Sequence, residues 1–457
     1  MSKRQSGDTP LLSLAMMVKN EERFLEDALL SARDWVDEMV VVDTGSVDRT
    51  VEIARDCGAD VSFFPWPNDF SKARNETIKR SKGDWIAILD ADERYRGRFP
   101  HRVRELLVPS DRWPYQGILL NVVNQGLDGQ VTHSFFNPRI FPRHPDVGYQ
   151  GRVHNCFGSV SRGTEQDFDL VKCNGLEIIH LGYDKAIYAE RKKVERNLTL
   201  LEAAVREEPE VSRYRFYLGR EYLNLKRYDE ANRLLRSVIE QPDADHLSYR
   251  EARITYLQSL HNAQAPFEVR LAELVDVLEE LPEEIDAWYF LSLAYSEQGL
   301  TDESINALEE GLKLMNTVES QMGQSCRLAG EYVSSAIILG QHYDQQVPAQ
   351  AETARTWMTE AWEKLTPQHP QWGKLLAPIA RWFFEQEDLS MMREILLVIA
   401  ERLEGPQLFR IFYFGLRQVA TLDAPRTALK IARRALAVTP QLRRDPQFTQ
   451  LLNELRR

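Results

Sequence analysis

The sequence has few cysteines and no pattern that would bind zinc through them. Four cysteines are spread over 457 residues, and no two of them form a CxxC pair. This excludes a zinc ribbon and a disulfide framework as organising features of the chain. A reducing, cytoplasmic setting is the simplest expectation.

Long apolar runs are also missing. The first run, LLSLAMMV at 11–18, leads directly into KNEE at 19–22. It is too short to span a bilayer and lacks the small-residue site at which a signal peptide is cleaved. No other segment approaches transmembrane length, so we expect a soluble protein with at most peripheral membrane contact.

Positive charge is in deficit. Lys and Arg together number 57 against 69 Asp and Glu, which gives a net charge of −12. An acidic chain is a poor default binder of nucleic acid, and we expect no such partner. The hydrophobic fraction of 43% allows large cores, and the length suits two or three domains.

The two halves of the sequence follow different patterns. Up to about residue 185, short apolar runs such as EMVVVD and DWIAILD alternate with helical segments such as EERFLEDALLSARD. This alternation predicts a parallel, doubly wound sheet. The later runs YQGILLNVVNQ and VTHSFFNPRIFPR have no helix between them and are expected to add antiparallel strands. From about residue 186 the chain is predicted to be helical.

Repeats are predicted in the helical half. One set of residues falls at tetratricopeptide offsets, and a second set takes equivalent places about two repeat lengths later: Leu218, Gly219, Tyr222, Ala231 and Leu235, then Trp288, Leu291, Tyr295 and Leu308. The expected organisation is a polar tail at 1–10, an α/β domain at 11–185, a connecting helix at 186–210 that packs on both halves, and a repeat domain at 211–457. Such repeats form a concave surface for peptides or proteins, or support a homo-oligomer.

Two common nucleotide-binding loops are absent. The first strand runs into MMVKNEE, which contains no glycine, and no Walker loop occurs anywhere. A nicotinamide enzyme and a P-loop nucleotidase are therefore disfavoured. Ligands in a doubly wound sheet bind at the strand ends, where this sequence has Asp43 after the second strand and Asp90 and Asp92 after the fourth.

The segment Asp90-Ala91-Asp92 indicates a metal site. Two carboxylates that flank a small residue can meet one hard divalent cation, and oxygen ligands favour Mg²⁺ or Mn²⁺. The cation would neutralise the two acids and bridge a diphosphate. The alternative is an exposed acidic turn, but these acids and Glu93 follow a strand that should be buried.

The ordered motifs of the first half resemble those of family 2 glycosyltransferases with the GT-A fold. The segments LSLAMMVKNEERFLEDAL, VDEMVVVDTGSVDRTVEIARDCGADV and FSKARNETIKRSKGDWIAILDADE carry the resemblance closely over 11–95, and it continues loosely to 185. With its repeats, the whole chain resembles bacterial transferases of this family that carry tetratricopeptide domains, peptide S-glycosyltransferases among them. The fold implied is an α/β GT-A domain with a doubly wound mixed sheet, followed by an all-α array of tetratricopeptide-like repeats.

The resemblance implies which residues bind the donor. Those expected around the nucleoside and diphosphate are Met16, Met17, Val18, Glu22, Asp43, Arg74, Asn75, Asp90 and Ala91, with Asp92 as metal ligand. Plainer roles remain open for some of them. Asp43 could form a turn, Arg74 could be a surface arginine, and Glu22 could occupy the first turn of a helix. For Asp48, capping a helix or turn is favoured over contact with ligand.

The acceptor side is less regular. Many relatives read His-Glu where this chain has His154-Asn155, and an asparagine is no general base. His154, Asp146 and Asp184 are the candidate bases, and His180 is expected to complete the metal shell or orient the diphosphate. At least one of Arg139, Arg143 and Arg152 is expected on the diphosphate, because guanidinium groups offer charge-assisted donors.

The reaction expected from the resemblance is an inverting, metal-dependent transfer of a sugar. The donor would be a nucleotide-diphosphate sugar, with uridine as the expected base, and the cofactor Mn²⁺ or Mg²⁺. The acceptor would be a peptide or protein, or a cell-envelope glycan. The alternative is a non-catalytic interaction protein whose transferase half is vestigial.

Overall fold

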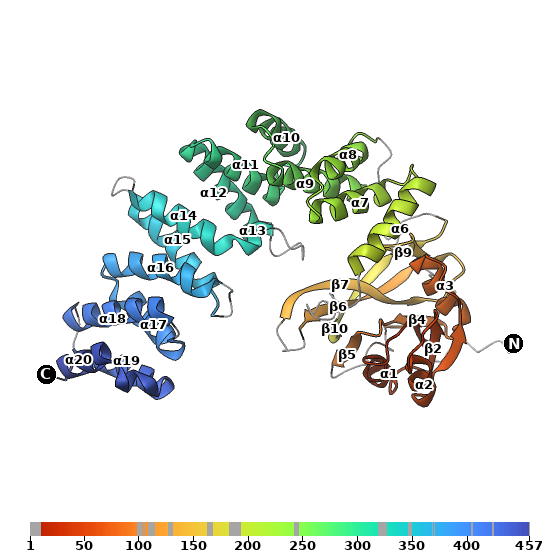
Figure 1. Ribbon diagram of the computed structural model, residues 1–457, viewed down its shortest axis with the longest axis horizontal. Helices are drawn as coiled ribbons and strands as arrows, with labels where there is room; N and C mark the ends of the chain where they lie inside the picture. Colours follow the sequence, from red (N-terminus) through yellow and green to blue (C-terminus); the bar gives the residue numbers. More distant parts are fainter. Residues whose placement is uncertain are drawn as a thin grey trace. The chain divides into compact units, whose positions relative to one another are not determined.

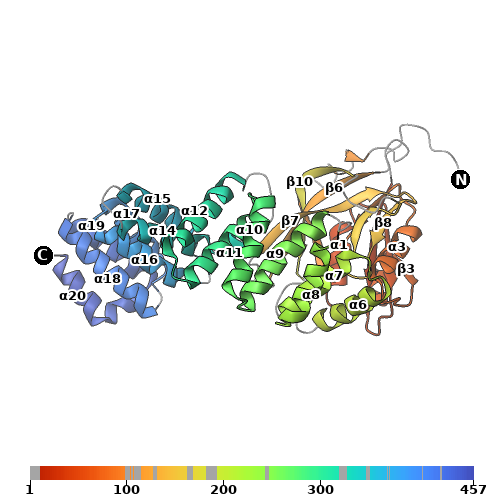
Figure 2. The same cartoon turned by 90° about the horizontal axis from the view of Figure 1, so that it is seen from above.

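The computed structural model divides into two compact units, Met1–Ala265 and Pro266–Arg457. Figures 1 and 2 show an α/β part in the first half of the chain and helices throughout the rest. The structure describes residues 11–97, 103, 106–107, 115–126, 131–161, 168–181, 193–241, 246–318, 327–345, 350–367, 369, 371–403, 405–422 and 425–456.

Four parallel strands begin the first unit. They are ordered β3-β2-β1-β4 in the sheet: β1 (Leu12–Val18), β2 (Glu38–Asp43), β3 (Asp60–Phe63) and β4 (Trp85–Ile88). The crossovers contain helices α1 (Leu25–Ala32), α2 (Thr50–Asp56) and α3 (Phe70–Arg80). β1 and β4 are almost wholly buried, which is typical of parallel strands covered on both faces. The carboxyl ends of β1, β2 and β4 lie at one edge of the sheet.

Antiparallel pairing extends the same sheet. Its order continues from β4 as β7-β6-β10-β5, formed by β5 (Glu93–Gly97), β6 (Gln116–Gln125), β7 (Val131–Pro142) and β10 (Asp169–His180). β10 is parallel to β6, while the β4–β7, β7–β6 and β10–β5 pairs are antiparallel. A separate two-stranded sheet joins β8 (Val147–Gln150) to β9 (Cys156–Ser159). The expected mixed sheet is thus confirmed.

Alternate residues of the central strands enter two different cores. Leu14, Met16 and Trp85 pack with α1 on one face. Ala15 and Ile86 pack on the other face with Ile78 of α3 and with aromatic residues from β7, β8 and β9. This alternation follows from the two-residue period of a strand and fixes which side chains can reach the sheet edge.

Four helices after the sheet belong to the same compact unit: α6 (Lys193–Glu207), α7 (Ser212–Asn224), α8 (Tyr228–Ile239) and α9 (His246–Asn262). Val153, from the β8–β9 connection, is buried among Leu201 and Tyr214 of these helices, and Trp66 and Phe70 pack against the same cluster. Arg196 of α6 also lies over the Phe70 ring, with its guanidinium carbon 4.9 Å from the ring centroid. The sheet and the first helices therefore share a hydrophobic core.

The repeat positions in α7 and α8 have a physical reason. Leu218, Ala231 and Leu235 are buried between the two helices. A Cβ added at Gly219 would come 2.9 Å from Cγ of Leu235, so the close approach of the helices requires glycine there.

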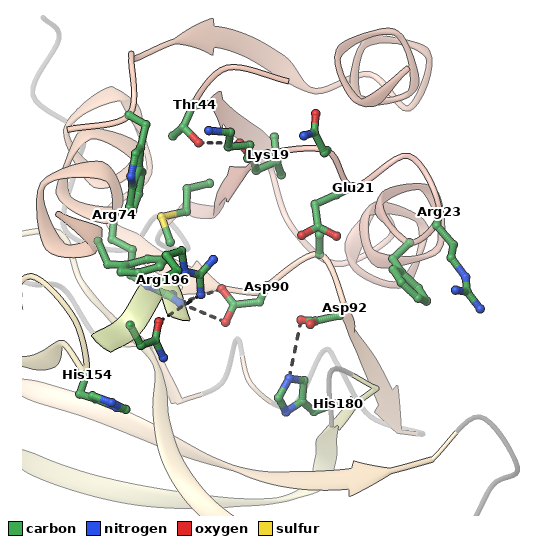
Figure 3. A pocket seen from close by; sticks show the side chains of 18 of the residues that line it. Lys19, Glu21, Arg23, Thr44, Arg74, Asp90, Asp92, His154, His180 and Arg196 are labelled. Carbon is green, nitrogen blue, oxygen red and sulfur yellow. Dashed lines mark hydrogen bonds and ion pairs between the residues drawn. The ribbon is translucent and has the colours of Figure 1, made fainter. Parts of the chain in front are cut away.

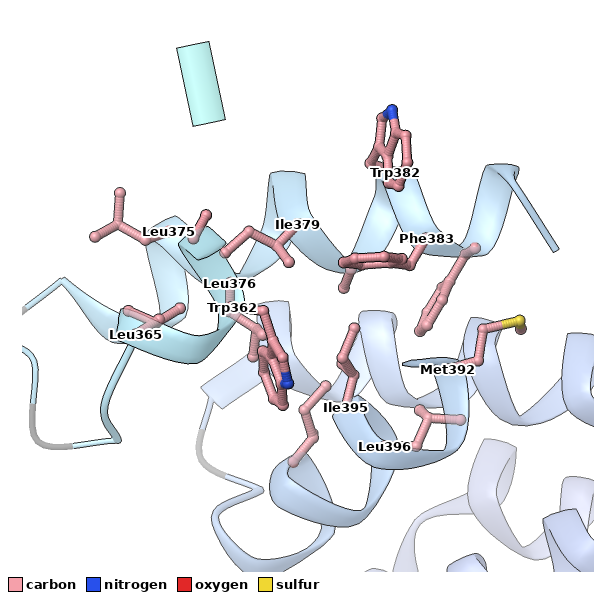
Figure 4. Close-up of a cluster of buried hydrophobic side chains, with 14 of the residues drawn as sticks. Trp362, Leu365, Leu375, Leu376, Ile379, Trp382, Phe383, Met392, Ile395 and Leu396 are labelled. Carbon is pink, nitrogen blue, oxygen red and sulfur yellow. The ribbon is translucent and has the colours of Figure 1, made fainter. Parts of the chain in front are cut away.

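The second unit is helical throughout its described residues. Its elements are α10 (Phe267–Glu280), α11 (Ile285–Glu297), α12 (Thr301–Val318), α13 (Arg327–Gly330), α14 (Tyr332–Gln345), α15 (Ala351–Lys364), α16 (Trp372–Glu385), α17 (Leu389–Glu401), α18 (Gly405–Leu422), α19 (Pro425–Val438), the 3-10 helix η3 (Pro440–Arg444) and α20 (Pro446–Glu454). Neighbouring helices bury large apolar side chains between them, as Trp362, Ile379, Phe383, Ile395 and Leu396 show (Figure 4). Within the described ranges, no helix is both long and apolar enough to cross a membrane.

Candidate active site

The loops that follow β1 and β2 are joined by reciprocal hydrogen bonds. Asn20 N donates to Ser46 Oγ at 2.8 Å, and Val47 N donates to Asn20 Oδ1 at 2.9 Å. Arg49 N donates to Glu22 Oε2 at 3.1 Å. The motifs KNEE and GSVDRT thus hold each other and form one wall at the carboxyl edge of the sheet.

Asp43 and Asp48 shape the second of these loops. The Asp43 carboxylate is 2% exposed and accepts hydrogen bonds from the backbone N–H groups of Gly45 and Ser46. Gly45 has φ +112°, in the region that favours glycine. Asp48 accepts from Thr50 N at 3.0 Å at the start of α2. The Asp43 carboxylate therefore forms a turn after β2, and the Asp48 carboxylate holds the first residue of α2.

A cavity of about 1030 Å³ opens beside this wall (Figure 3). Many of the expected site residues line it: Met17, Val18, Glu22, Arg74, Asp90, Ala91, Asp92 and His180 from the donor side, and the candidate base His154. Thr44 lines it in place of Asp43, while Met16 packs in the core at 1% exposure. The structure thus brings most of the expected donor-side residues to one place.

Each acid after β4 has a cationic or imidazole partner. Arg74 donates to both carboxylate oxygens of Asp90, at 2.7 and 3.0 Å. Arg139 donates to Glu93 at 2.6 Å. Asp92 faces His180 (Figure 3). Each of the three neighbouring acids therefore has its own partner, which offsets the repulsion among their carboxylates. Burial opposes ionisation of Asp90, but the charges of Arg74 and Arg139 prevail and lower its pKa to about 2.

Asp92 and His180 are placed so that both could act as metal ligands. Asp92 Oδ1 and His180 Nε2 lie 3.7 Å apart. His180 Nδ1 is 2.7 Å from Asn124 Oδ1, so in the neutral ring Nδ1 carries the proton and Nε2 turns its lone pair toward Asp92. Two lone-pair donors that face the same space suit a divalent cation. In the described part of the chain, no three His, Cys, Asp or Glu side chains gather as metal ligands, so further ligands would come from substrate oxygens or water.

The free energy of unfolding is expected to depend on pH through the Glu93 carboxyl. Burial raises the pKa of its carboxyl to about 7, against the opposing effect of Arg139. In the unfolded chain the pKa of a glutamate is about 4.3, so the contribution of Glu93 to the free energy of unfolding is fully present below pH 4.3. It is lost as the pH rises through 7, by at most about 1.4 kcal/mol per pH unit. We expect the melting temperature to fall between pH 5 and pH 8 by an amount that E93Q removes. Parallel profiles for the wild type and E93Q would contradict this.

His154 occupies an unusual place on the acceptor side. Its φ is +48°, and its ring stacks on Tyr217 with centroids 4.1 Å apart and planes at 15°. Burial, together with Arg220, lowers the pKa of its imidazole to about 4. The ring is therefore neutral at physiological pH, and Nε2 lies 3.9 Å from Glu221 Oε1.

The arginines at the cavity are not those expected on the diphosphate. Arg139 pairs with Glu93, Arg143 donates to the Gly83 carbonyl, and Arg152 pairs with Glu207. The cations that line the cavity are Lys19, Arg23, Arg74, Arg196 and Arg220. Of these, Arg196 and Arg220 come from α6 and α7, and nothing in the motifs of the first half points to them.

Other expected site residues lie outside the cavity lining. The Asn75 amide bonds both backbone groups of Tyr149, each at 2.8 Å, and so ties α3 to β8. Asp146 accepts from Ser159 Oγ at 2.6 Å and from Tyr115 and Ser161. Asp184 lies outside the described residues.

Comparisons with known proteins agree with this arrangement. The model of glycosyl transferase family 2 matches residues 13–160, and a tetratricopeptide repeat model matches residues 285–315. A TPR repeat-containing protein of Synechococcus elongatus is 30% identical over 297 residues, which cover 63% of this chain and 72% of that protein.

Two further relatives carry the word glycosyltransferase in their names. The SPbeta prophage-derived glycosyltransferase SunS of Bacillus subtilis is 28% identical over 295 residues, covering 63% of this chain and 67% of its own. An uncharacterized glycosyltransferase of Rickettsia bellii is 42% identical over 86 residues, covering 19% of this chain and 29% of its own. The chain belongs to glycosyl transferase family 2 and is a glycosyltransferase that carries tetratricopeptide repeats.

Proposed function

We propose that the chain transfers a sugar from a UDP-linked donor, with inversion and with the help of Mn²⁺ or Mg²⁺. The observation that carries the proposal is the Asp92–His180 pair, which faces the cavity next to the Arg74–Asp90 pair. The nucleoside would lie along the wall formed by the loops after β1 and β2, with Met17, Val18 and Thr44 beneath it. Asp92 and His180 would hold the cation.

Positively charged side chains of the cavity would stabilise the leaving group. Negative charge builds on the diphosphate as the bond to the sugar breaks. Arg74, Arg196 and Lys19 all line the cavity, and positive groups already in place stabilise that charge without having to reorganise. A bound divalent cation adds Lewis-acid stabilisation of the same oxygens.

The repeats in the rest of the chain favour one kind of acceptor over another. Tetratricopeptide repeats present surfaces that bind peptides and proteins, so a polypeptide acceptor is the first candidate. A cell-envelope glycan is the second, with the repeats then serving assembly. A panel of cysteine-containing and serine-containing peptides, tested beside lipid-linked glycans, distinguishes these acceptors.

The experiment that tests the proposal is donor hydrolysis by the full-length chain. UDP-glucose, UDP-galactose, UDP-N-acetylglucosamine, GDP-mannose and dTDP-glucose are each incubated with Mn²⁺ or with EDTA, and released nucleoside diphosphate is measured. We expect one UDP-sugar to be hydrolysed with Mn²⁺ and none with EDTA, and NMR of fresh product to show inversion. No release from any donor would contradict the proposal and favour a scaffold with a vestigial transferase half.

A further inference from the structure

One wall of the cavity comes from a helix rather than from the sheet. Arg220, Glu221 and Asn224 of α7 all line it. With Tyr217, which stacks on His154, they fall at the spacing i, i+3, i+4 and i+7 and so occupy one face of the helix. Other α7 residues, Leu218 among them, pack in the helical core. The first helices after the sheet thus supply cavity side chains in addition to support.

His154 is held against that helical face in a conformation that needs support. A φ of +48° is uncommon for a residue other than glycine and persists only where the surroundings enforce it. The stack on Tyr217 supplies that enforcement. The ring's Nε2 is buried without a hydrogen-bond partner, and it lies 3.9 Å from Glu221 Oε1. The strained backbone therefore places an imidazole edge beside the Glu221 carboxylate.

The other acids of the cavity lie on the donor side. Asp90 is bound by Arg74, and Asp92 faces His180. Asp48 and Glu22 accept hydrogen bonds within the loop wall. Figure 3 shows Glu21 and Lys19 on one side of Asp90 and His154 on the other. Of the described carboxylates that line the cavity, Glu221 is the one that sits beside His154.

We propose that Glu221 is the general base that deprotonates the acceptor, and that His154 is the positioning residue that orients its carboxylate. This inference rests on the proposed inverting transfer. Inversion requires the acceptor to attack from the face of the sugar opposite the diphosphate, so a base belongs across the cavity from the groups that bind the donor.

In the proposed step, Glu221 Oε takes the proton from the acceptor O–H or S–H, and the acceptor's electron pair forms the new bond to the anomeric carbon. The bond from that carbon to the diphosphate oxygen breaks, and its electron pair leaves with the nucleoside diphosphate. Glu221 thereby supplies the carboxylate that Asn155 cannot.

The test uses the full-length chain and the donor that it hydrolyses, with water as acceptor. E221Q is expected to lower kcat by about a hundredfold or more, which is typical of the loss of a general base. UDP affinity in the presence of Mn²⁺, measured by calorimetry, should stay unchanged. H154A should lower kcat while leaving UDP affinity unchanged, a split that a merely structural role for His154 would not produce. Formate should restore turnover to E221A.

The matched control is E210Q, which makes the same substitution at an exposed position between α6 and α7 and should behave as the wild type. Turnover by E221Q within about threefold of the wild type would overturn the inference alone, because a general base contributes far more. Loss of UDP affinity in E221Q would also overturn it, by placing Glu221 on the donor side. A wild type that hydrolyses no donor would remove the proposed function and the base together.

Discussion

Replacing Asp92 by alanine is expected to lower donor turnover by about a thousandfold or more, since a metal ion contributes several kcal/mol to stabilising a leaving diphosphate. Asp92 is 5% exposed and lines the cavity opposite His180. Its two acidic neighbours are already engaged, Asp90 by Arg74 and Glu93 by Arg139. The measurement is the Mn²⁺-dependent release of UDP.

The fold should survive this substitution. The charge of Asp92 adds to the raised pKa of Glu93, so removing it relieves repulsion within a buried acidic cluster. We therefore expect D92A and D92N to melt at or above the temperature of the wild type. The control is D56N at the end of α2, an exposed position outside the cavity, which should leave turnover unchanged. A folded D92A with normal turnover would remove Asp92 from the metal site.

Removing the helices after the sheet is expected to abolish activity, whereas removing the second unit is not. A chain that ends at residue 181 loses Leu201 and Tyr214, which bury Val153 and cover Trp66 and Phe70. It also loses Arg196, Arg220 and Glu221 from the cavity. We expect this chain to aggregate, or to melt well below the longer one without binding UDP.

A chain that ends at residue 265 retains the whole first unit. It should fold, bind UDP with Mn²⁺ and hydrolyse the donor at a rate close to that of the full chain, while transfer to a polypeptide acceptor falls. Circular dichroism melts and calorimetry with UDP compare the two truncations. Full donor hydrolysis by the chain that ends at residue 181 would contradict the shared core and the helical cavity wall.

The donor side could be predicted because its residues sit in consecutive motifs. Asp90 and Asp92 follow a strand, which puts them at the sheet edge, and Arg74 lies in α3 within a motif that carries the family resemblance; all three line the cavity. Asp43 follows the same logic, but its carboxylate is occupied by the turn at Gly45 and Ser46. A strand-end position therefore predicts that an acid lies at the sheet edge without deciding what its carboxylate binds.

The cavity residues from the helices after the sheet could not be predicted in the same way, because they meet the sheet only through tertiary packing. Arg196 and Glu221 lie in helices that were expected to connect and repeat, and the periodicity of a helix does not say which outside surface its polar face meets. A polar face at 217, 220, 221 and 224, opposite the repeat's buried positions, was the available signal. Arg139 was a candidate for binding the diphosphate but instead pairs with the buried Glu93. This pairing, too, forms only through tertiary packing.

The most direct test of the donor site is a crystal structure of the full chain with UDP and Mn²⁺, collected at a wavelength where manganese scatters anomalously. We predict an anomalous peak between Asp92 and His180, with the diphosphate beside it and the uracil along the wall formed by the loops after β1 and β2. UDP bound in the cavity with no manganese at Asp92, or manganese bound elsewhere with Asp92 and His180 still facing each other, would contradict it.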